Sequence, residues 1–264
     1  MTSAPHASRL SDVVADLPAV SLEDVDARSA LQRRVDNKYL VTWEQLQRLV
    51  AALSGDHEAL EIDGRRVFRY ESVYFDTPDL ASFRDHTAGR TPRTKIRSRL
   101  YVDSGAGSFE LKVKLPDGET AKAACDQGGG EHGRLTPATG TFLREQLARM
   151  TGRDDPGPLA PTLITRFERA TISARSGTER ITCDAGVELV RPGGDAVRLV
   201  DRRVLVETKS ETGRERADQV LLEAGIEPVS FSKYRVGIGL LVSRDPEPQL
   251  GGAPERWFRP VATV

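Results

Sequence analysis

Basic side chains recur at every second position along several short segments of the chain. In the segment 93–101, positions 93, 95, 97 and 99 are all Arg or Lys, and in 108–115 the positions 112 and 114 are Lys. Side chains two apart along a β-strand lie on one face, so each segment would present a row of cations on one side. Ammonium and guanidinium groups gathered in this way bind a densely charged anion such as a polyphosphate.

The same alternation, followed through the whole chain, aligns twelve basic residues with three carboxylates. The basic residues are Arg34, Lys38, Arg93, Lys95, Arg97, Arg99, Lys112, Lys114, Lys122, Arg169, Lys209 and Lys233, and the carboxylates are Asp36, Glu110 and Glu207. A half-exposed sheet with a solvated charged face is the ordinary alternative. Solvated faces usually mix signs, because like charges opposite each other in a sheet cost roughly 0.2–1 kcal/mol a pair. The excess of cations therefore favours an anion site, in which the carboxylates could hold a divalent metal that bridges phosphate oxygens.

The composition narrows the class of protein. The chain has 264 residues, 38% of them hydrophobic, and a net charge of −1. It is long enough to bury a full core, and no apolar run reaches the roughly 20 residues of a membrane span. Two cysteines and no secretory leader indicate a cytoplasmic protein without a disulfide framework. We expect no nucleic-acid partner, because the charged segments carry few aromatic residues on which bases would stack.

Hydrophobic patterning predicts the elements that must position these residues. Thr42 and Gln45 form a capping box for a helix that ends before Gly55. Further helices are expected over 22–31, 80–85, 141–150, 216–224 and the end of 232–241. Strands are expected over 34–41, 67–75, 93–101, 108–115, around Lys122, and over 163–173, 179–184 and 199–208. We expect one domain over 21–244, with a flexible segment at 1–20 and a flexible tail at 245–264.

These elements predict an α+β fold built on an antiparallel sheet. If the apolar residues face helices outside and the charged residues face inward, the sheet must curl into a barrel with a basic lumen. Eight strands give an interior wide enough for one small ligand. The fold class is therefore an eight-stranded antiparallel β-barrel with helices packed outside.

Eight short motifs, in order, resemble those of a known family. They lie at 34–39, 72–77, 93–101, 109–114, 167–170, 181–184, 206–209 and 231–234. In this order they are similar to the strands of VTC domains, the polyphosphate polymerase branch of the triphosphate tunnel metalloenzymes. The resemblance runs from about residue 33 to residue 241.

The resemblance implies a tunnel of eight antiparallel strands in which ATP donates its terminal phosphoryl group to polyphosphate, with Mn²⁺ or Mg²⁺. Carried over by motif, the catalytic residues would be Arg97, Arg99, Lys112 and Arg169. The motifs also place Lys38 and Lys233 on phosphates. The other aligned basic residues are expected to bind phosphates as well; they are Arg34, Arg93, Lys95, Lys114, Lys122 and Lys209. Glu207 would hold the metal. Glu110 would be either a second acidic ligand or a partner of Lys112.

Two other functions remain open at this point. The same tunnel would serve a hydrolase of tripolyphosphate or nucleoside triphosphates, with water as the acceptor. A sensor that binds polyphosphate without turnover is the third reading. A membrane-protein partner would leave no visible segment in this sequence.

Overall fold

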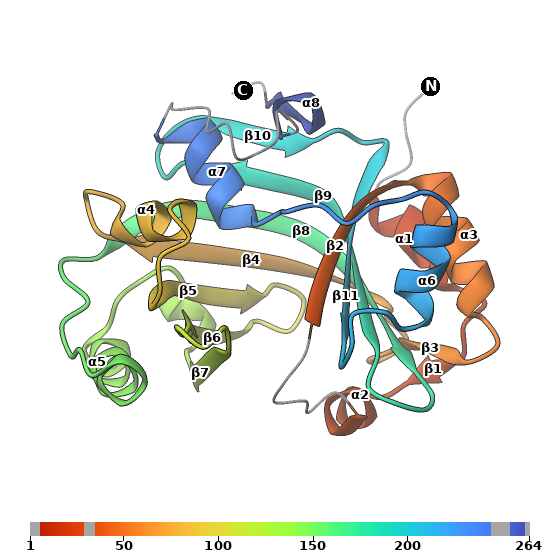
Figure 1. Cartoon of the computed structure of the whole chain (residues 1–264), viewed down its shortest axis with the longest axis horizontal. Coiled ribbons are helices and arrows are strands. Elements are labelled where there is room, and N and C mark those ends of the chain that lie inside the picture. Colours follow the sequence, from red (N-terminus) through yellow and green to blue (C-terminus); the bar gives the residue numbers. More distant parts are fainter. Residues whose placement is uncertain (1–5, 29–34, 244–253, 262–264) are drawn as a thin grey trace. The chain divides into compact units, whose positions relative to one another are not determined.

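The computed structural model describes residues 6–28, 35–243 and 254–261. Their contacts divide the chain into two compact units, each built from segments that are far apart in the sequence. Figure 1 labels the helices and strands of the chain. Unit 1 comprises Met1–Arg69, Phe167–Val187 and Leu199–Ser230, and unit 2 comprises Tyr70–Arg166, Glu188–Arg198 and Phe231–Val264. None of the helices in the described part of the chain has the length and apolar character that crossing a bilayer requires.

Helices and strands alternate along the chain. The helices are α1 His6–Val14, α2 Leu22–Arg28, α3 Trp43–Leu53, α4 Ala81–Thr87, α5 Pro137–Thr151, α6 Arg216–Glu223, α7 Lys233–Leu241 and α8 Pro254–Trp257, with a 3-10 turn at Gly129–Glu131. The strands are β1 Ala19–Val20, β2 Val35–Thr42, β3 His57–Leu60, β4 Val67–Asp76, β5 Arg93–Tyr101, β6 Ala106–Lys114, β7 Thr120–Asp126, β8 Ala160–Ala174, β9 Arg180–Val190, β10 Ala196–Leu199, β11 Arg203–Ser210 and β12 Phe258–Pro260.

The strands form one hydrogen-bonded sheet in the order β12-β10-β9-β8-β4-β5-β6-β7, and β11 joins β2 to β9. The α+β antiparallel fold is thus confirmed. The sheet has twelve strands rather than eight, because short strands such as β1, β3 and β10 carry too few residues to show a pattern. The pair β1–β3 is parallel. Among the described residues no ladder joins the two ends of the strand order, so the hydrogen-bonded sheet is open.

Strand β9 is longer than the sequence pattern indicates. It pairs with β11 over Arg180–Asp184 and, on the same edge, with β10 over Glu188–Val190. Gly186 lies between the two pairings with a positive φ of 59°. Glycine adopts this conformation without a steric penalty, so the strand continues through the position where the pattern predicted its end.

The core of unit 1 lies on one face of β2, β8, β9 and β11. Tyr39, Ile172, Cys183 and Val206 are buried there together with the apolar sides of α1, α3 and α6. Figure 1 shows these three helices side by side. Because the apolar residues alternate with the charged ones, packing this face turns the charged residues to the other side.

Residues 10–17 belong to this core, where the sequence predicted a flexible segment over 1–20. Leu10, Val14 and Leu17 are buried and pack in the same cluster as α3. Helix α1 is polar on its other side, and this polar side led the sequence analysis to predict a loose end. The apolar stripe at helical spacing nevertheless supplies enough burial to dock it.

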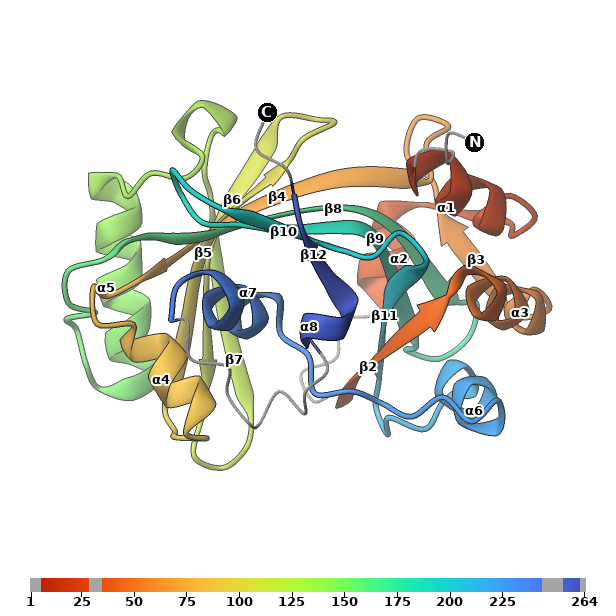
Figure 2. The same ribbon diagram turned by 90° about the horizontal axis from the view of Figure 1, so that it is seen from above.

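The core of unit 2 lies between β4, β5, β6 and helix α5. Phe75, Ile96, Phe109 and Leu111 are buried against Leu143 of α5. Figure 2 shows α5 and α7 on opposite sides of β5 and β6. The apolar face of these strands is therefore covered by α5, and their charged face is the one toward α7.

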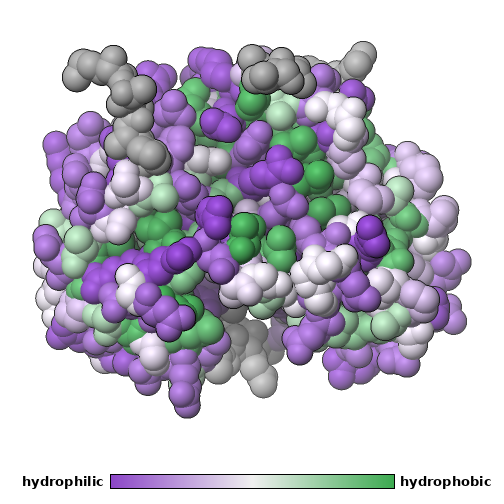
Figure 3. All heavy atoms as spheres, turned by 180° about the vertical axis from the view of Figure 1, so that it is seen from behind, coloured by the Kyte–Doolittle hydropathy of each residue, from purple (hydrophilic) through white to green (hydrophobic). Residues whose placement is uncertain are grey.

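The described part of the C-terminal tail also packs within unit 2, where the sequence predicted a loose end at 245–264. Strand β12 is hydrogen-bonded to β10, Phe258 is buried, and its ring stacks on Phe231 at 6.3 Å. The one buried aromatic residue in a Pro- and Gly-rich stretch gave no periodicity to recognise. On the face that Figure 3 shows, hydrophilic residues surround several groups of apolar residues, and exposed apolar residues are normal for a globular protein.

Candidate functional site

In unit 2 the strand register brings like charges directly opposite one another. Lys95 pairs with Lys112 across β5 and β6, and Lys112 pairs with Lys122 across β6 and β7. We call these residues the three-lysine row. The buried neighbours Ile96 and Leu111 fix the orientation of the strands, so all three ammonium groups share one face. Three cations in direct register are unfavourable in an empty sheet and favourable around an anion.

Glu110 is the carboxylate that sits among these cations. Its Oε2 accepts hydrogen bonds from Arg97 Nε at 2.8 Å and Nη2 at 2.5 Å. Its Oε1 lies 3.7 Å from Arg99 Nη1 and 3.4 Å from Lys122 Nζ. Burial alone would raise the pKa of Glu110, but the charges of Arg97, Arg99 and Lys122 outweigh it and lower the pKa to about 2. Glu110 is therefore an ionised counter-ion that holds the arginine side chains in place.

Tyr74 extends this cluster on the next strand. Arg97 Nη1 donates to the Tyr74 hydroxyl at 3.3 Å. Burial would raise the pKa of Tyr74, yet the neighbouring charges, Arg97 first, lower it overall. Burial acts against the charge of Arg97 as well, but Tyr74 and Glu110 outweigh it and raise the pKa of the guanidinium. Arg97 is thus a permanent cation with a fixed direction.

The start of α7 is anchored against the charged face of unit 2. Ser232 caps the helix, and its Oγ accepts a hydrogen bond from Lys95 Nζ at 3.3 Å. The hydroxyl of Tyr234 donates to the buried carboxylate of Asp76. Lys233, between them, is the first residue of α7. These contacts fix the backbone from which the Lys233 side chain extends.

Asp76 is a positioning residue that the sequence analysis did not single out. Its Oδ1 accepts from the backbone N–H groups of Thr77 at 2.8 Å and Ser82 at 2.9 Å, and its Oδ2 accepts from Phe83 at 3.1 Å. It therefore links the end of β4 to the start of α4 and to Tyr234. The Asp-Thr pair at the end of an aromatic strand was the signal, but the contact with α7 could not be read from it.

In unit 1 a second charged face lies on β2 and β11. The Lys38 Nζ is 3.1 Å from Glu207 Oε1, and the Lys209 Nζ is 2.8 Å from Glu207 Oε2. In register, Glu207 faces Lys38 and Lys209 faces Asp36. Burial would raise the pKa of Glu207, but Lys209 and Lys38 hold it well below its usual range. Burial also lowers the pKa of Lys209 to about 8, with a further contribution from Arg169.

Strand β9 adds two residues to this face that the sequence analysis missed. Asp184 accepts both hydrogen bonds of a bidentate pair with Arg169, at 2.6 Å and 2.8 Å. Thr182 lies directly opposite Glu207, and its buried hydroxyl has no hydrogen-bond partner among the described residues. The alternation of positions 180, 182 and 184 was the available signal, but the neighbouring strand could not be identified from sequence.

A divalent metal fits unit 1 if phosphate oxygens supply part of its ligands. No group of three or more His, Cys, Asp or Glu side chains with metal-ligand geometry occurs in the described residues. Glu207 offers an ionised carboxylate, and the buried Thr182 hydroxyl faces the same side. Mg²⁺ is commonly bound by one or two carboxylates together with substrate phosphates. The donor set therefore suits a metal that arrives with its phosphates.

The structure places the predicted residues in two groups. Lys38, Arg169, Glu207 and Lys209 are in unit 1, whereas Arg93, Lys95, Arg97, Arg99, Glu110, Lys112, Lys114, Lys122 and Lys233 are in unit 2. Arg34 lies outside the described residues. Arg93 and Lys114 form the next register pair beyond the three-lysine row, and each donates to a backbone carbonyl, of Arg90 and Gly118 respectively.

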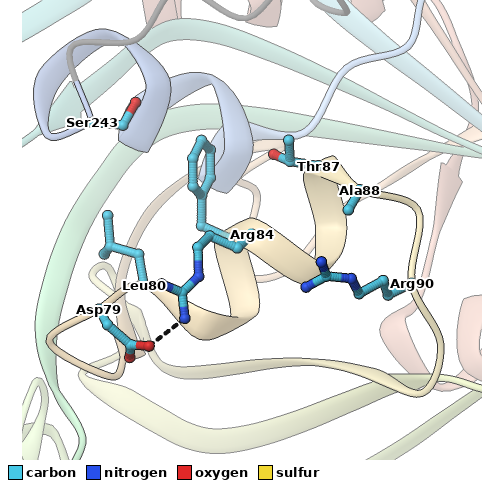
Figure 4. Close-up of a pocket in the computed structure, with 8 residues that line it drawn as sticks. Asp79, Leu80, Arg84, Thr87, Ala88, Arg90 and Ser243 are labelled. Atoms are coloured by element: carbon cyan, nitrogen blue, oxygen red, sulfur yellow. Dashed lines mark hydrogen bonds and ion pairs between the residues drawn. The ribbon is translucent and has the colours of Figure 1, made fainter.

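A pocket of about 560 Å³ lies elsewhere in unit 2, between α4 and the end of α7 (Figure 4). Phe83, Arg84, Arg90 and Ser243 are among its lining residues, and Arg84 forms an ion pair with Asp79. None of the predicted site residues lines this pocket. The charged strands, and not this pocket, are the candidate site.

A solved structure shares the fold of this chain. A candidate adenylyl cyclase from Hippeastrum, described as having a dominant triphosphatase activity, superposes with a TM-score of 0.51 at 18% identity, over 80% of this chain and 99% of that chain. A candidate adenylate cyclase from Bacillus halodurans gives a TM-score of 0.44 at 17% identity, over 80% of this chain and 98% of that chain. No curated protein sequence matches the chain.

The family model of the VTC domain matches residues 33–242, which is most of the chain. This range coincides with the eight motifs and confirms the resemblance stated from them. The chain belongs to the VTC domain family.

Proposed function

We propose that this chain is an enzyme that transfers the terminal phosphoryl group of ATP to a polyphosphate chain. The observation that supports it most is the three-lysine row beside Arg97 and Arg99. Register-paired lysines cost stability unless an anion compensates them. A linear phosphate chain carries regularly spaced negative charge, and it would compensate several of these cations at once.

The chemistry required fits these residues. Phosphoryl transfer depends mainly on positioning the phosphates and on neutralising charge that spreads over the equatorial oxygens. The attacking atom is a phosphate oxygen that is already ionised at neutral pH, so no strong general base is needed. The P–O bond to ADP breaks as the bond to the acceptor oxygen forms, and ADP leaves with the electron pair. The fixed cation Arg97 would hold a transferring phosphate in line.

The roles follow the two charged faces. In unit 2, Arg97, Arg99 and Lys112 would stabilise the transferring group, with Lys95, Lys122 and Lys233 on neighbouring phosphates. In unit 1, Arg169, Lys38 and Lys209 would bind phosphates, and Glu207 would hold Mn²⁺ or Mg²⁺. Such a metal supplies charge neutralisation for the phosphate oxygens that it binds. Arg34, Arg93 and Lys114 complete the proposed set.

Hydrolysis of a triphosphate is the second candidate function. It is favoured by the triphosphatase activity given for the Hippeastrum protein, which shares the fold. The same residues would serve, with water in place of the acceptor phosphate. Water is a poorer nucleophile at neutral pH, so a hydrolase would gain from a group that takes its proton.

Product analysis separates the candidates. The purified protein is incubated with ATP and Mn²⁺, with and without a short polyphosphate primer, and the products are resolved by chain length. We expect chains that lengthen with one ADP for each phosphate added, and we expect Glu207→Gln to abolish the activity. Glu145→Gln, on the exposed side of α5, is the matched control. Free phosphate without chains would establish the hydrolase instead, and tight polyphosphate binding without turnover would indicate a sensor.

A further inference from the structure

The charged face of unit 2 ends in two aromatic side chains. Tyr101 is the last residue of β5 and lies opposite Tyr70 of β4 in register. Their rings meet edge to face, with centroids 5.3 Å apart. Because Tyr101 follows Arg97 and Arg99 at two-residue spacing, its ring lies on the face that carries the cations.

Packing does not account for Tyr101. The tyrosines Tyr39, Tyr74 and Tyr234 are all buried, and the hydroxyl of each has a hydrogen-bond partner. Tyr101, in contrast, is 36% exposed. An exposed aromatic ring at the end of an otherwise charged face is a surface on which a planar ligand group can stack.

The register pair next to the two tyrosines, Ser72 and Arg99, has two polar groups that can bind a phosphate or a sugar. The Arg99 guanidinium lies over the Tyr70 ring at 5.6 Å. Ser72 is opposite Arg99 in register, is 1% exposed, and its hydroxyl has no hydrogen-bond partner among the described residues. By alternation with Tyr74, this hydroxyl points to the charged face. A buried unpartnered hydroxyl beside a cation indicates a polar ligand at this row.

The spacing matches a nucleotide. Arg99 and Tyr101 are two residues apart, which is about 7 Å along a strand. A ribose spans the gap between a phosphate at Arg99 and a base at Tyr101. Stacking on an aromatic ring recognises any base, because every base has a π face. Phosphate-binding groups and an aromatic ring are thus arranged in the order of a nucleoside triphosphate.

We propose that Tyr101, held by Tyr70, is a platform for the nucleobase of a nucleoside triphosphate bound with its phosphates at Arg99 and Arg97. The inference rests on the proposed function, which makes ATP the donor, and it adds the residue that binds the base of that donor.

The test compares two ligands that differ in the nucleoside. Binding of ATP and of inorganic tripolyphosphate, each with Mg²⁺, is measured by calorimetry for the wild type and for Tyr101→Ala. We expect the variant to lose about tenfold in ATP affinity and to keep its tripolyphosphate affinity. Tyr101→Phe retains the ring and should bind ATP like the wild type. Leu100→Ala, on the opposite face of β5, is the matched control and should change neither affinity.

The other outcomes are distinct. Unchanged ATP affinity in Tyr101→Ala overturns the platform. An equal loss for both ligands also overturns it, because the side chain then acts on the phosphate site or on the fold. If the wild type binds tripolyphosphate but not ATP, the platform is wrong while phosphate binding stands. If the wild type binds neither ligand, the proposed function fails and the platform fails with it.

Discussion

At the residue scale, Glu110 holds together the cations of unit 2. Its side chain is 5% exposed, and Arg97, Arg99 and Lys122 all lie within ion-pair distance. A buried carboxylate without partners would be protonated, but three cations keep this one ionised. Removal of its charge would leave the partly buried arginines to repel each other. An uncompensated buried charge of this kind strongly destabilises the folded state.

We therefore predict that Glu110→Gln lowers the free energy of unfolding by about 3 kcal/mol at pH 7. The folded pKa of about 2 is below the usual value, so this stabilisation is present above about pH 4.5 and disappears as the pH falls toward 2. Denaturant unfolding of both proteins between pH 7 and pH 3 measures the difference. The difference in the free energy of unfolding should become smaller below pH 4.5. A difference that does not depend on pH would contradict the assignment of Glu110 as an ionised counter-ion. Glu145→Gln serves as the control.

Thr182 provides a matched test in unit 1. Its buried hydroxyl has no hydrogen-bond partner in the described part of the chain and faces Glu207, whereas the buried hydroxyl of Thr208 donates to Asp218 at 2.7 Å. We predict that Thr182→Val leaves the free energy of unfolding unchanged or higher, and weakens binding of Mn²⁺ with tripolyphosphate severalfold. Thr208→Val should do the reverse, with a loss of about 1–3 kcal/mol in stability and unaltered binding. Calorimetry and denaturant unfolding measure the two effects. Identical behaviour of the two variants would exclude a ligand role for Thr182.

At the element scale, the alternation of residue types was sufficient to predict which side chains share a face. Strand β5 has the expected bounds, and the capping box of Thr42 and Gln45 begins α3 as predicted. Helix α5 begins earlier than predicted, because Thr136 caps it and Pro137 occupies its first position. Pro fits there because its missing N–H has no partner in the first turn.

The pairing partners of each strand could not be predicted. The three-lysine row depends on the register between β5, β6 and β7, and a slip of one residue would place Lys112 on the apolar side. The contact of Gly237 with Leu163 depends on the approach of α7 to β8, where an added Cβ would come within 2.5 Å of the Leu163 side chain. Such close approaches are decided by tertiary packing, which no local pattern shows.

The three-lysine row has opposite effects on stability and on binding. We predict that Lys112→Gln, which removes the middle charge, raises the free energy of unfolding by up to about 1 kcal/mol in anion-free buffer of low salt. The same variant should bind tripolyphosphate at least tenfold more weakly. Thermal unfolding and calorimetry measure the two changes. Arg149→Gln, an exposed charge on α5, should change neither. A loss of stability in Lys112→Gln would mean that the row is an ordinary solvated face.

At the scale of the whole molecule, a net charge of −1 conceals two charged faces, one in each compact unit. The sequence predicted most members of both faces from spacing and motif order, but it missed Thr182, Asp184 and the positioning role of Asp76. It did not predict that residues 10–17 and Phe258 are buried. Short segments of this kind dock on a core that only the folded protein contains. The family match extends over the segments that carry both faces.

The most direct test of the account is a crystal structure of the protein grown with tripolyphosphate and Mn²⁺, with anomalous data that locate the metal. We expect phosphate groups on Arg97 and the three-lysine row, and an anomalous peak at the Glu207 carboxylate. Phosphate absent from the charged strands, or manganese bound away from Glu207, would contradict the central claim that the face of unit 2 binds phosphate and that Glu207 of unit 1 binds the metal.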